Sequence, residues 1–187
     1  KLIALLFALL AAGDCLAVGV GFPLEPANAN VGDRASLQRG ARLFVNYCGG
    51  CHSLTYLRYS RLAEDLGLTE KQVMDNLNFT GGKFGDPINA SLVPADAIAW
   101  FGIAPPDLSL TARAKPGGAD WIYTYLKTFY VDDTRLAGWN NPVLPNAGMP
   151  HALWELQGIQ RVVTEPRAKD AAGNELPCHK GDIGTEC

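Results

Sequence analysis

The sequence predicts an all-α domain with long irregular loops, and three observations lead to this fold class. Apolar residues recur at helical spacing in several windows. No alternating strand pattern extends beyond a few residues, and glycine (20 of 187 residues) and proline (12) are frequent between the windows. The length suits one domain with a core of its own. A net charge of -3 without any Lys/Arg run argues against a nucleic-acid binder.

The first segment predicts export. Residues 1–12 have a basic start and an apolar run that is too short to span a bilayer but suits a secretory h-region. Cys15 and Ala17 offer a cleavage site, so we expect a signal peptide over 1–17. A buried core helix is the alternative, and Asp14 before Cys15 disfavours a lipoprotein. No later window contains 18 consecutive apolar residues.

An amphipathic helix is predicted over 34–51, after an extended arm at 22–31. Asp33 supplies a capping side chain. The apolar positions recur at intervals of three and four, and they are Leu37, Ala41, Phe44, Tyr47 and Cys48. The paired cysteines of this chain are therefore expected at the C-terminal end of a helix.

Further helices are expected along the rest of the domain, which we assign to 18–164. They are predicted at 69–78 with Thr69 as cap, at 96–101, within 117–130 and at 152–160. Proline and glycine predict loops at 81–94, 102–110 and 131–150. Residues 165–187 read as a polar tail.

The stretch "NYCGGCHSL" contains the strongest motif, in which Cys48 and Cys51 are followed directly by His52. Chance gives this pattern in about two of a thousand chains of this composition. A redox dithiol would follow a strand and begin a helix, whereas here a helix precedes it. Zinc would need two more ligands, and the spacing of the remaining candidates fits no finger pattern; they are Cys178, His179 and Cys187.

Covalent haem fits the motif best. Cys48 and Cys51 would add to the vinyl groups as thioethers, and His52 would ligate the iron. Positions i, i+3 and i+4 lie on one helical face, so all three side chains can act on one ring. A covalently held cofactor is also retained in an exported protein.

A haem that only carries electrons needs a second axial ligand, and the candidates are Met74, Met149, His151 and His179. Met74 shares an apolar stripe with Leu77, which favours a core role. Met149 follows a glycine and precedes a proline, on a stiff loop far along the chain from His52. Its thioether would favour ferrous iron and raise the reduction potential. His151 competes, although a histidine hydrogen-bonded to the backbone is the interpretation we prefer for it.

Four segments distributed between residues 22 and 158 read "FPLE", "ASLQRGARLFVNYCGGCHSLTYLRYSRL", "APPDLSLTARAKPGGADWIYTYL" and "GMPHALWELQG". In their order and spacing they resemble the cytochrome c1 family of the cytochrome bc1 complex, particularly its proteobacterial form. The resemblance implies an all-α, cytochrome c-like haem domain with long irregular loops.

The resemblance also implies particular site residues. One haem c (heme c) would be attached through Cys48 and Cys51, with His52 as the proximal and Met149 as the distal iron ligand. Pro106 would pack against the haem and exclude water. Arg113 would lie near a propionate, where a guanidinium can pair with the carboxylate.

The implied function is electron transfer within ubiquinol–cytochrome c reductase, by a subunit that is not catalytic by itself. Electrons would come from the Rieske iron–sulfur protein and pass to cytochrome c. The implied partners are cytochrome b and the Rieske protein in a dimeric complex, on the periplasmic side of the bacterial inner membrane. The alternative is a stand-alone periplasmic haem peroxidase or gas sensor, which needs an open sixth iron position. A dithiol oxidoreductase is a third class.

Three further features depart from the family or stay open. The C-terminal transmembrane anchor of the family is not in this sequence, so membrane attachment is implied by the resemblance alone. Cys178 and Cys187 in the tail either form a disulfide in an oxidising compartment or remain free thiols. Two acidic pairs, at 64–65 and 132–133, are either a docking patch for a basic partner or ordinary solvated surface.

Overall fold

The structure is a computed structural model and describes residues 22–162, 172 and 174. The predicted signal peptide, the tail cysteines and His179 lie outside these residues. In chain order the elements are α2 (Arg34–Tyr47), β1 (Leu54–Arg58), α3 (Tyr59–Leu66), α4 (Glu70–Asn76), β2 (Pro87–Ile88), α5 (Pro94–Phe101), α6 (Thr111–Ala114), α7 (Gly118–Lys127), β3 (Tyr130–Val131), β4 (Trp139–Asn140) and α8 (Trp154–Gln157).

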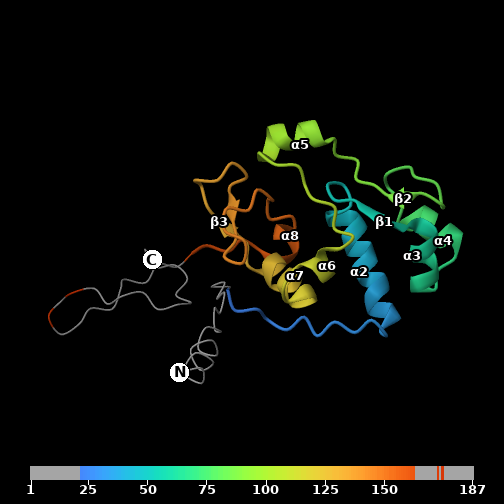
Figure 1. The fold of residues 1–187 in the computed structure, drawn as a ribbon, viewed down its shortest axis with the longest axis horizontal. Coiled ribbons are helices and arrows are strands. Elements are labelled where there is room, and N and C mark those ends of the chain that lie inside the picture. The colour runs from blue at the N-terminus through green and yellow to red at the C-terminus, as the bar shows by residue number, and fades with distance from the viewer. Residues whose placement is uncertain (1–21, 163–171, 173, 175–187) are drawn as a thin grey trace, which may run out of the picture.

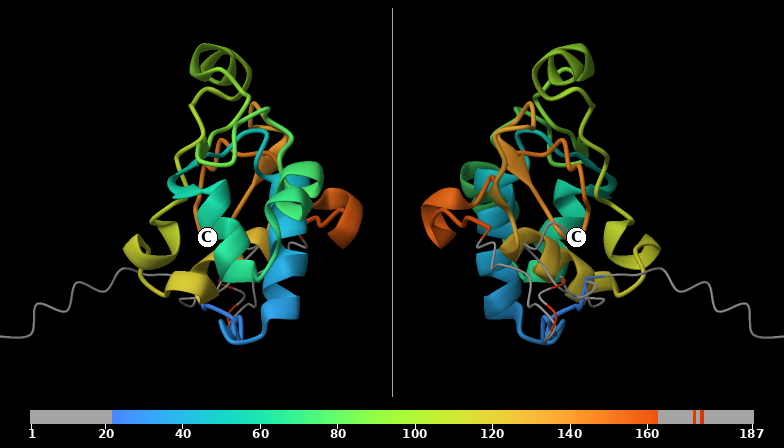
Figure 2. Two further views of the ribbon diagram at one scale, coloured as in Figure 1. Left: turned by 90° about the vertical axis from the view of Figure 1, so that its right-hand side faces the viewer. Right: turned by 90° about the vertical axis from the view of Figure 1, so that its left-hand side faces the viewer.

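The elements form two halves, each with its own core. Figure 1 shows α2, α3, α4, β1 and β2 on one side and α7, α8 and β3 on the other, with α6 between them. The side views in Figure 2 show α5 projecting from one end of the body. We call the first group the α2–α4 half and the second the α7–α8 half.

Aliphatic side chains dominate the core of the α2–α4 half. Its buried members are Tyr59, Ala63, Leu66, Val73, Leu77 and Ile88. Full burial of a large apolar side chain contributes about 1.5–3 kcal/mol, so this cluster is a main source of stability. Met74 packs against the cluster and is half-buried, in agreement with the core role preferred for it.

Helix α2 begins where predicted and ends earlier than predicted. The Asp33 carboxylate accepts the N–H of Ser36 and caps the first turn. The helix ends at Tyr47 rather than at 51, and the N–H groups of Cys48 and Gly49 both donate to the Phe44 carbonyl. Consecutive glycines follow Cys48 in the sequence and weaken helix continuation. The cysteine motif is therefore a turn after the helix and not its last turn.

Four short strands accompany the helices. β1 pairs with β2, and β3 pairs with β4, in two antiparallel two-stranded sheets. The chain is thus mostly helical with long loops, as predicted, but "all-α" is too strict a description. Strands of two residues are too short to show an alternating sequence pattern, and they were not predicted.

The other helices differ from the predictions mainly at their ends. Thr69 caps α4, as predicted, and the structure shows that it does so in a reciprocal capping box with Gln72. α5 begins at Pro94, a residue type favoured in the first helical turn. α3 and the four-residue α6 were not predicted, and α8 covers only part of the expected 152–160.

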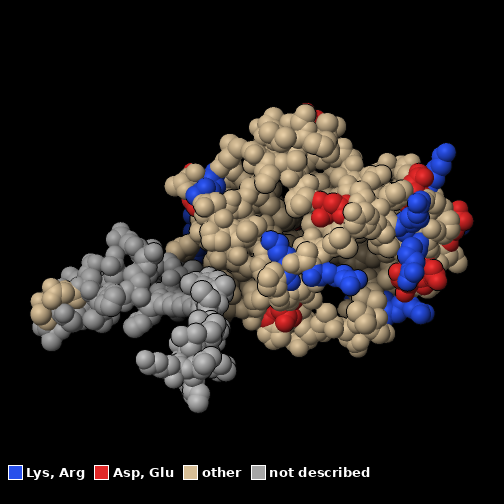
Figure 3. Space-filling model, in the orientation of Figure 1, with Lys and Arg blue, Asp and Glu red and all other residues tan. Residues whose placement is uncertain are grey.

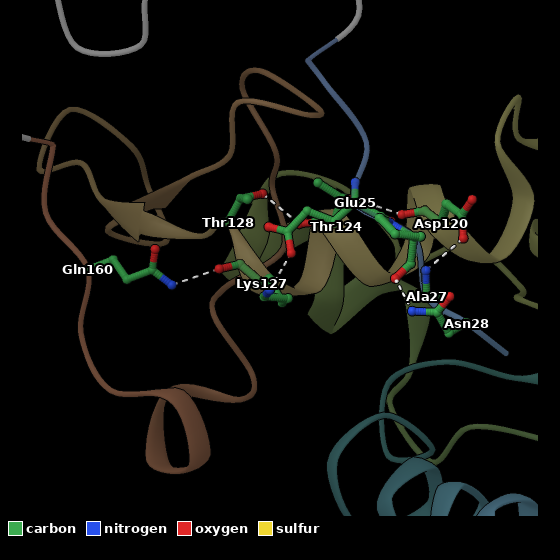
Figure 4. Close-up of polar contacts among 9 residues, drawn as sticks. Glu25, Ala27, Asn28, Asp120, Thr124, Lys127, Thr128 and Gln160 are labelled. Carbon is green, nitrogen blue, oxygen red and sulfur yellow. Dashed lines mark hydrogen bonds and ion pairs between the residues drawn. The ribbon is translucent and has the colours of Figure 1, made fainter.

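The N-terminal arm runs extended along α7 (Figure 4). The backbone N–H of Glu25 donates to the Thr124 hydroxyl at 2.9 Å, and that of Ala27 donates to the Asp120 carboxylate at 2.8 Å. The Glu25 carboxylate also pairs with the Lys127 ammonium group. The arm therefore anchors the start of the described chain to the α7–α8 half.

Candidate functional site

The cysteine motif forms a tight turn at the end of α2. The N–H groups of Cys51 and His52 both donate to the Cys48 carbonyl, at 3.0 and 2.8 Å. Cys48 is half-buried and Cys51 is exposed, and neither forms a disulfide. His52, by contrast, is buried, with 8 % of its surface exposed. The turn thus presents two free thiols beside a fixed imidazole.

The imidazole of His52 is oriented by Pro106. Its Nδ1 lies 2.8 Å from the Pro106 carbonyl oxygen. A carbonyl can only accept, so Nδ1 carries the proton and Nε2 keeps its lone pair. Histidines that bind metals are commonly held in this way, with the second ring nitrogen donating to a backbone carbonyl.

The loop that carries Pro106 is hydrogen-bonded to the segment that follows His52. The N–H of Leu108 donates to the Ser53 carbonyl at 2.9 Å. The Asp107 carboxylate accepts from Thr55 N–H at 2.8 Å. Burial opposes ionisation of Asp107, but hydrogen bonds from Ser109 and Thr55 outweigh it and lower the pKa of the carboxyl to about 2.

Met149 lies in the α7–α8 half. It is half-buried and packs against the cluster of Tyr125, Phe129 and Ala147. The Tyr125 hydroxyl donates to the Met149 sulfur at an O–S distance of 3.6 Å. Burial raises the pKa of Tyr125 to about 12, so the hydroxyl is a proton donor at any physiological pH.

The backbone before Met149 fits closely against a neighbouring loop. A Cβ placed on Gly148 would lie 2.6 Å from the Ile103 side chain and 3.2 Å from the Phe101 carbonyl oxygen. Only glycine leaves room for this approach. Pro150 stiffens the chain on the other side. The loop is therefore held in place on both sides of the thioether.

His151 lies in a loop, as predicted, but its ring is buried among aromatic side chains rather than held by a well-formed hydrogen bond to the backbone. Only 2 % of its surface is exposed, and its ring stacks on Phe129 at 5.3 Å and meets Trp139 edge-on. Neither ring nitrogen has a hydrogen-bond partner of normal geometry. Burial lowers the pKa of His151, and the nearby Gly158 backbone offsets this only in part. Burial therefore disfavours the charged form of the ring.

Arg113 lies in the last turn of α6, between the two halves, and is exposed. Its guanidinium makes no hydrogen bond or ion pair with any residue that the structure describes, so it is available to an anionic group. The structure thus brings His52 and Pro106 into contact, places Met149 in the other half and leaves Arg113 on the link between them. Sequence reasoning missed Asp107, Ser109 and Tyr125, whose partners are distant in sequence.

The thiol environment disfavours the dithiol and zinc interpretations. Burial, and then the neighbouring Cys51, raise the pKa of Cys48. Redox-active thiols and zinc ligands need the opposite shift, toward the thiolate. Within the described part of the chain, no three His, Cys, Asp or Glu side chains gather to hold a metal ion. Two free thiols, an oriented imidazole and a packed thioether fit a c-type haem instead.

Comparison with known proteins points to the same cofactor. Residues 28–155 match the model of the Cytochrome C1 family. A cytochrome c1 of Allochromatium vinosum is 54% identical over 166 residues, covering 89% of this chain and 67% of the relative. An ammonia monooxygenase gamma subunit of Nitrosomonas europaea is 44% identical, covering 87% of this chain and 66% of that protein.

A more distant relative is the mitochondrial cytochrome c1 heme protein of Neurospora crassa, 32% identical over 149 residues, which covers 68% of this chain and 45% of the relative. The chain spans about two thirds of the length of the two more similar proteins. The family match includes the cysteine motif, the Pro106 loop and Met149. This chain belongs to the cytochrome c1 family, and its cofactor is haem c.

Proposed function

We propose that this chain is the haem-bearing electron-transfer subunit of a ubiquinol–cytochrome c reductase. It takes electrons from the Rieske iron–sulfur protein and passes them to cytochrome c. The observation that carries the proposal is the buried His52, whose Nδ1 donates to the Pro106 carbonyl directly after two unbridged cysteines. Membership of the cytochrome c1 family supplies the context.

Each site residue has a distinct role in the proposal. Cys48 and Cys51 would hold the haem through thioether bonds, and the Nε2 atom of His52 would ligate its iron. The thioether of Met149 would be the second iron ligand, and a sulfur ligand favours the ferrous state. When bound, the haem supplies reversible one-electron chemistry between ferric and ferrous iron.

Two residues act on the surroundings of that group. Pro106 contributes an apolar wall that excludes water, while its carbonyl fixes the His52 imidazole. Arg113, whose guanidinium has no partner among the described residues, would pair with a propionate. Neither task requires a general base or a nucleophile, so the chain alone breaks no substrate bond.

The proposal extends to assembly and location. Cytochrome b and the Rieske protein are the partners within a dimeric complex, on the periplasmic side of the inner membrane. The signal peptide at 1–17 directs export of a haem domain over 18–164. Within residues 22–162, no helix is both long and apolar enough to cross a membrane.

The contacts of the acidic pairs at 64–65 and 132–133 favour an ordinary solvated surface over a docking patch for a basic partner. Arg61 pairs with both Glu64 and Asp65, at 3.9 and 2.7 Å. Asp132 lies 3.7 Å from Arg135 and accepts hydrogen bonds from Thr134 and Asn140. Figure 3 shows blue and red side chains intermingled on the α2–α4 side of the visible face. Mixed charges of this kind do not attract a basic partner strongly.

Spectroscopy of the exported protein tests the proposal. We expect a pyridine haemochrome of the c type, haem that stays on the polypeptide in denaturing gels, and no binding of carbon monoxide by the reduced protein. Cys48→Ala and Cys51→Ala should each weaken or abolish haem retention in the gel. Rapid carbon monoxide binding by the unaltered protein would instead indicate an open iron position, as in a peroxidase or gas sensor.

A further inference from the structure

We propose that Asp107 and Ser109 are positioning residues for the proximal ligand. They bind the Pro106 loop to the segment after His52, and in this way fix the tautomer and the rotation of the imidazole. The inference rests on the proposed role of His52 as an iron ligand. It concerns two side chains that touch neither the imidazole nor the iron.

The two segments lie side by side through a continuous set of hydrogen bonds. From one end to the other, the pairs are His52 Nδ1 with Pro106 O at 2.8 Å, Leu108 N with Ser53 O at 2.9 Å, Thr55 N with Asp107 Oδ2 at 2.8 Å and Tyr56 N with Ser109 Oγ at 3.1 Å. We call this set the 52–109 clamp. Two of its four acceptors are side-chain oxygens, so substitution can remove them without altering the backbone.

The shape of β1 explains why side chains are used. β1 pairs with β2 at Leu54 and Arg58, with an irregular register between them. The intervening N–H groups of Thr55 and Tyr56 donate to Asp107 and Ser109 instead of to a strand. A regular strand directs successive N–H groups to opposite sides, so one backbone partner could not accept both.

Asp107 is itself held in the geometry that this task needs. Its second carboxylate oxygen accepts the N–H of Ser109 at 2.8 Å, which closes a turn over Leu108. One carboxylate thus binds both its own loop and the segment after His52. Both carboxylate oxygens of Asp107 accept hydrogen bonds, which suits the ionised form of the side chain. An asparagine amide here would place its NH₂ group against one of the two backbone N–H donors, and that hydrogen bond would be lost.

The clamp determines what the imidazole can do. Pro106 has no N–H and cannot anchor itself to the neighbouring segment, so its carbonyl position depends on the residues that follow. If the loop moves, the Nδ1–H···O bond to Pro106 lengthens and the ring is free to rotate. A weaker bond makes Nε2 a poorer donor, which disfavours ferric iron and raises the reduction potential.

The test uses the haem-loaded, full-length chain and follows the His52 Nδ1 proton by NMR together with the reduction potential. The variants are Asp107→Asn, Ser109→Ala and Ser109→Thr, with Asp133→Asn as the matched control. Asp133 is exposed, and its side chain has no hydrogen bond or ion pair among the described residues. We expect the Nδ1 proton to exchange with solvent about ten-fold faster or more in Asp107→Asn and Ser109→Ala, the change expected for loss of a hydrogen bond.

The potential should also rise in these two variants, while the haem stays covalently attached. Ser109→Thr keeps the hydroxyl acceptor and should resemble the unaltered protein, as should Asp133→Asn. Should Asp107→Asn fail to accumulate, the contrast between Ser109→Ala and Ser109→Thr decides the question. Unchanged exchange and potential in every variant, with the haem in place, would overturn the inference. Failure of the proposed function would give a different result: the unaltered protein would carry no covalent haem, or its absorption spectrum would not be that of a c-type cytochrome.

Discussion

The two halves of this molecule hold their predicted iron ligands in different ways. In the α2–α4 half, a directed hydrogen bond of 2.8 Å orients His52, and the 52–109 clamp supports it. In the α7–α8 half, Met149 packs among aromatic rings and receives one long hydrogen bond to its sulfur. Hydrogen bonds fix direction, whereas apolar packing fixes volume and tolerates small adjustments.

This difference suits the chemistry of the two groups. An imidazole must present one nitrogen in one orientation, so its second nitrogen needs a defined partner. A thioether sulfur has weak and flexible hydrogen-bonding demands, and its side chain adapts to the space available. We therefore expect substitutions near His52 to alter the reduction potential without loss of ligation, and changes to the packing around Met149 to alter ligation and stability.

The largest effect is expected from Met149→Leu. Leucine keeps the volume and the fold but removes the sulfur, so the reduction potential should fall by on the order of 0.1–0.4 V, a fraction of the roughly 0.8 V that axial ligands span. The ferrous protein should then bind carbon monoxide. Spectroelectrochemical titration measures both properties. Met74→Leu, in the core of the other half, is the control and should leave the potential unchanged.

A second substitution tests the aromatic support of the distal loop. Phe129 is fully buried and stacks on His151, so Phe129→Ala should lower the free energy of unfolding by about 3–5 kcal/mol. It should also weaken methionine ligation, because the cluster around Met149 loses its central ring. Val73→Ala, in the α2–α4 core, should destabilise the fold without altering ligation. Denaturant titration measures stability, and the absorption spectrum of the oxidised protein measures methionine ligation. If Phe129→Ala and Val73→Ala lost ligation equally, the packing of the α7–α8 half would have no special role in holding Met149.

Tyr125→Phe should produce a smaller electronic effect. The hydroxyl draws electron density from the Met149 sulfur, so its removal should favour ferric iron and lower the potential by about 20–60 mV. This range follows because a hydrogen bond contributes about 1 kcal/mol and a ten-fold change in a one-electron equilibrium is about 59 mV. Redox titration would contradict this hypothesis if the potential rose or did not change. Tyr123→Phe, an exposed tyrosine on the same helix, is the control.

The smallest effect concerns pH. The pKa of Asp107 is lowered to about 2 in the folded chain from an ordinary value of 3.8. The ionised carboxylate therefore adds to the free energy of unfolding above the ordinary pKa, and this contribution is lost as the pH falls from about 4 to about 2. Thermal melting over this range should show a steeper loss for the unaltered protein than for Asp107→Asn. Parallel melting curves would show that the carboxylate contributes nothing to stability.

Local signals in the sequence were sufficient for the cysteine motif and for the starts of α2 and α4. The caps at Asp33 and Thr69 each depend on residues three apart, and both formed as predicted. The end of α2 was placed too late, because apolar spacing alone does not register the two glycines after Cys48. The cysteine motif was recognised because its residues are contiguous.

Contacts between distant segments were not predictable from local pattern. β1 is a strand because Leu54 meets Ile88, and Asp107 contacts Thr55 across 52 positions. His151 was expected to hydrogen-bond in a loop, but Phe129 and Trp139 enclose it. These features depend on how the halves fold, and nothing in the neighbouring sequence specifies their partners. The roles of Asp107 and Tyr125 therefore became visible only in three dimensions.

The central claim is that the iron lies between an imidazole from one half and a thioether from the other. The most direct measurement is the low-temperature magnetic circular dichroism of the oxidised, unaltered protein in the near infrared, where histidine–methionine and bis-histidine ligation give bands at different energies. The account predicts the histidine–methionine band, and its loss in Met149→Leu. A bis-histidine band that persists in Met149→Leu and disappears in His151→Ala would contradict it.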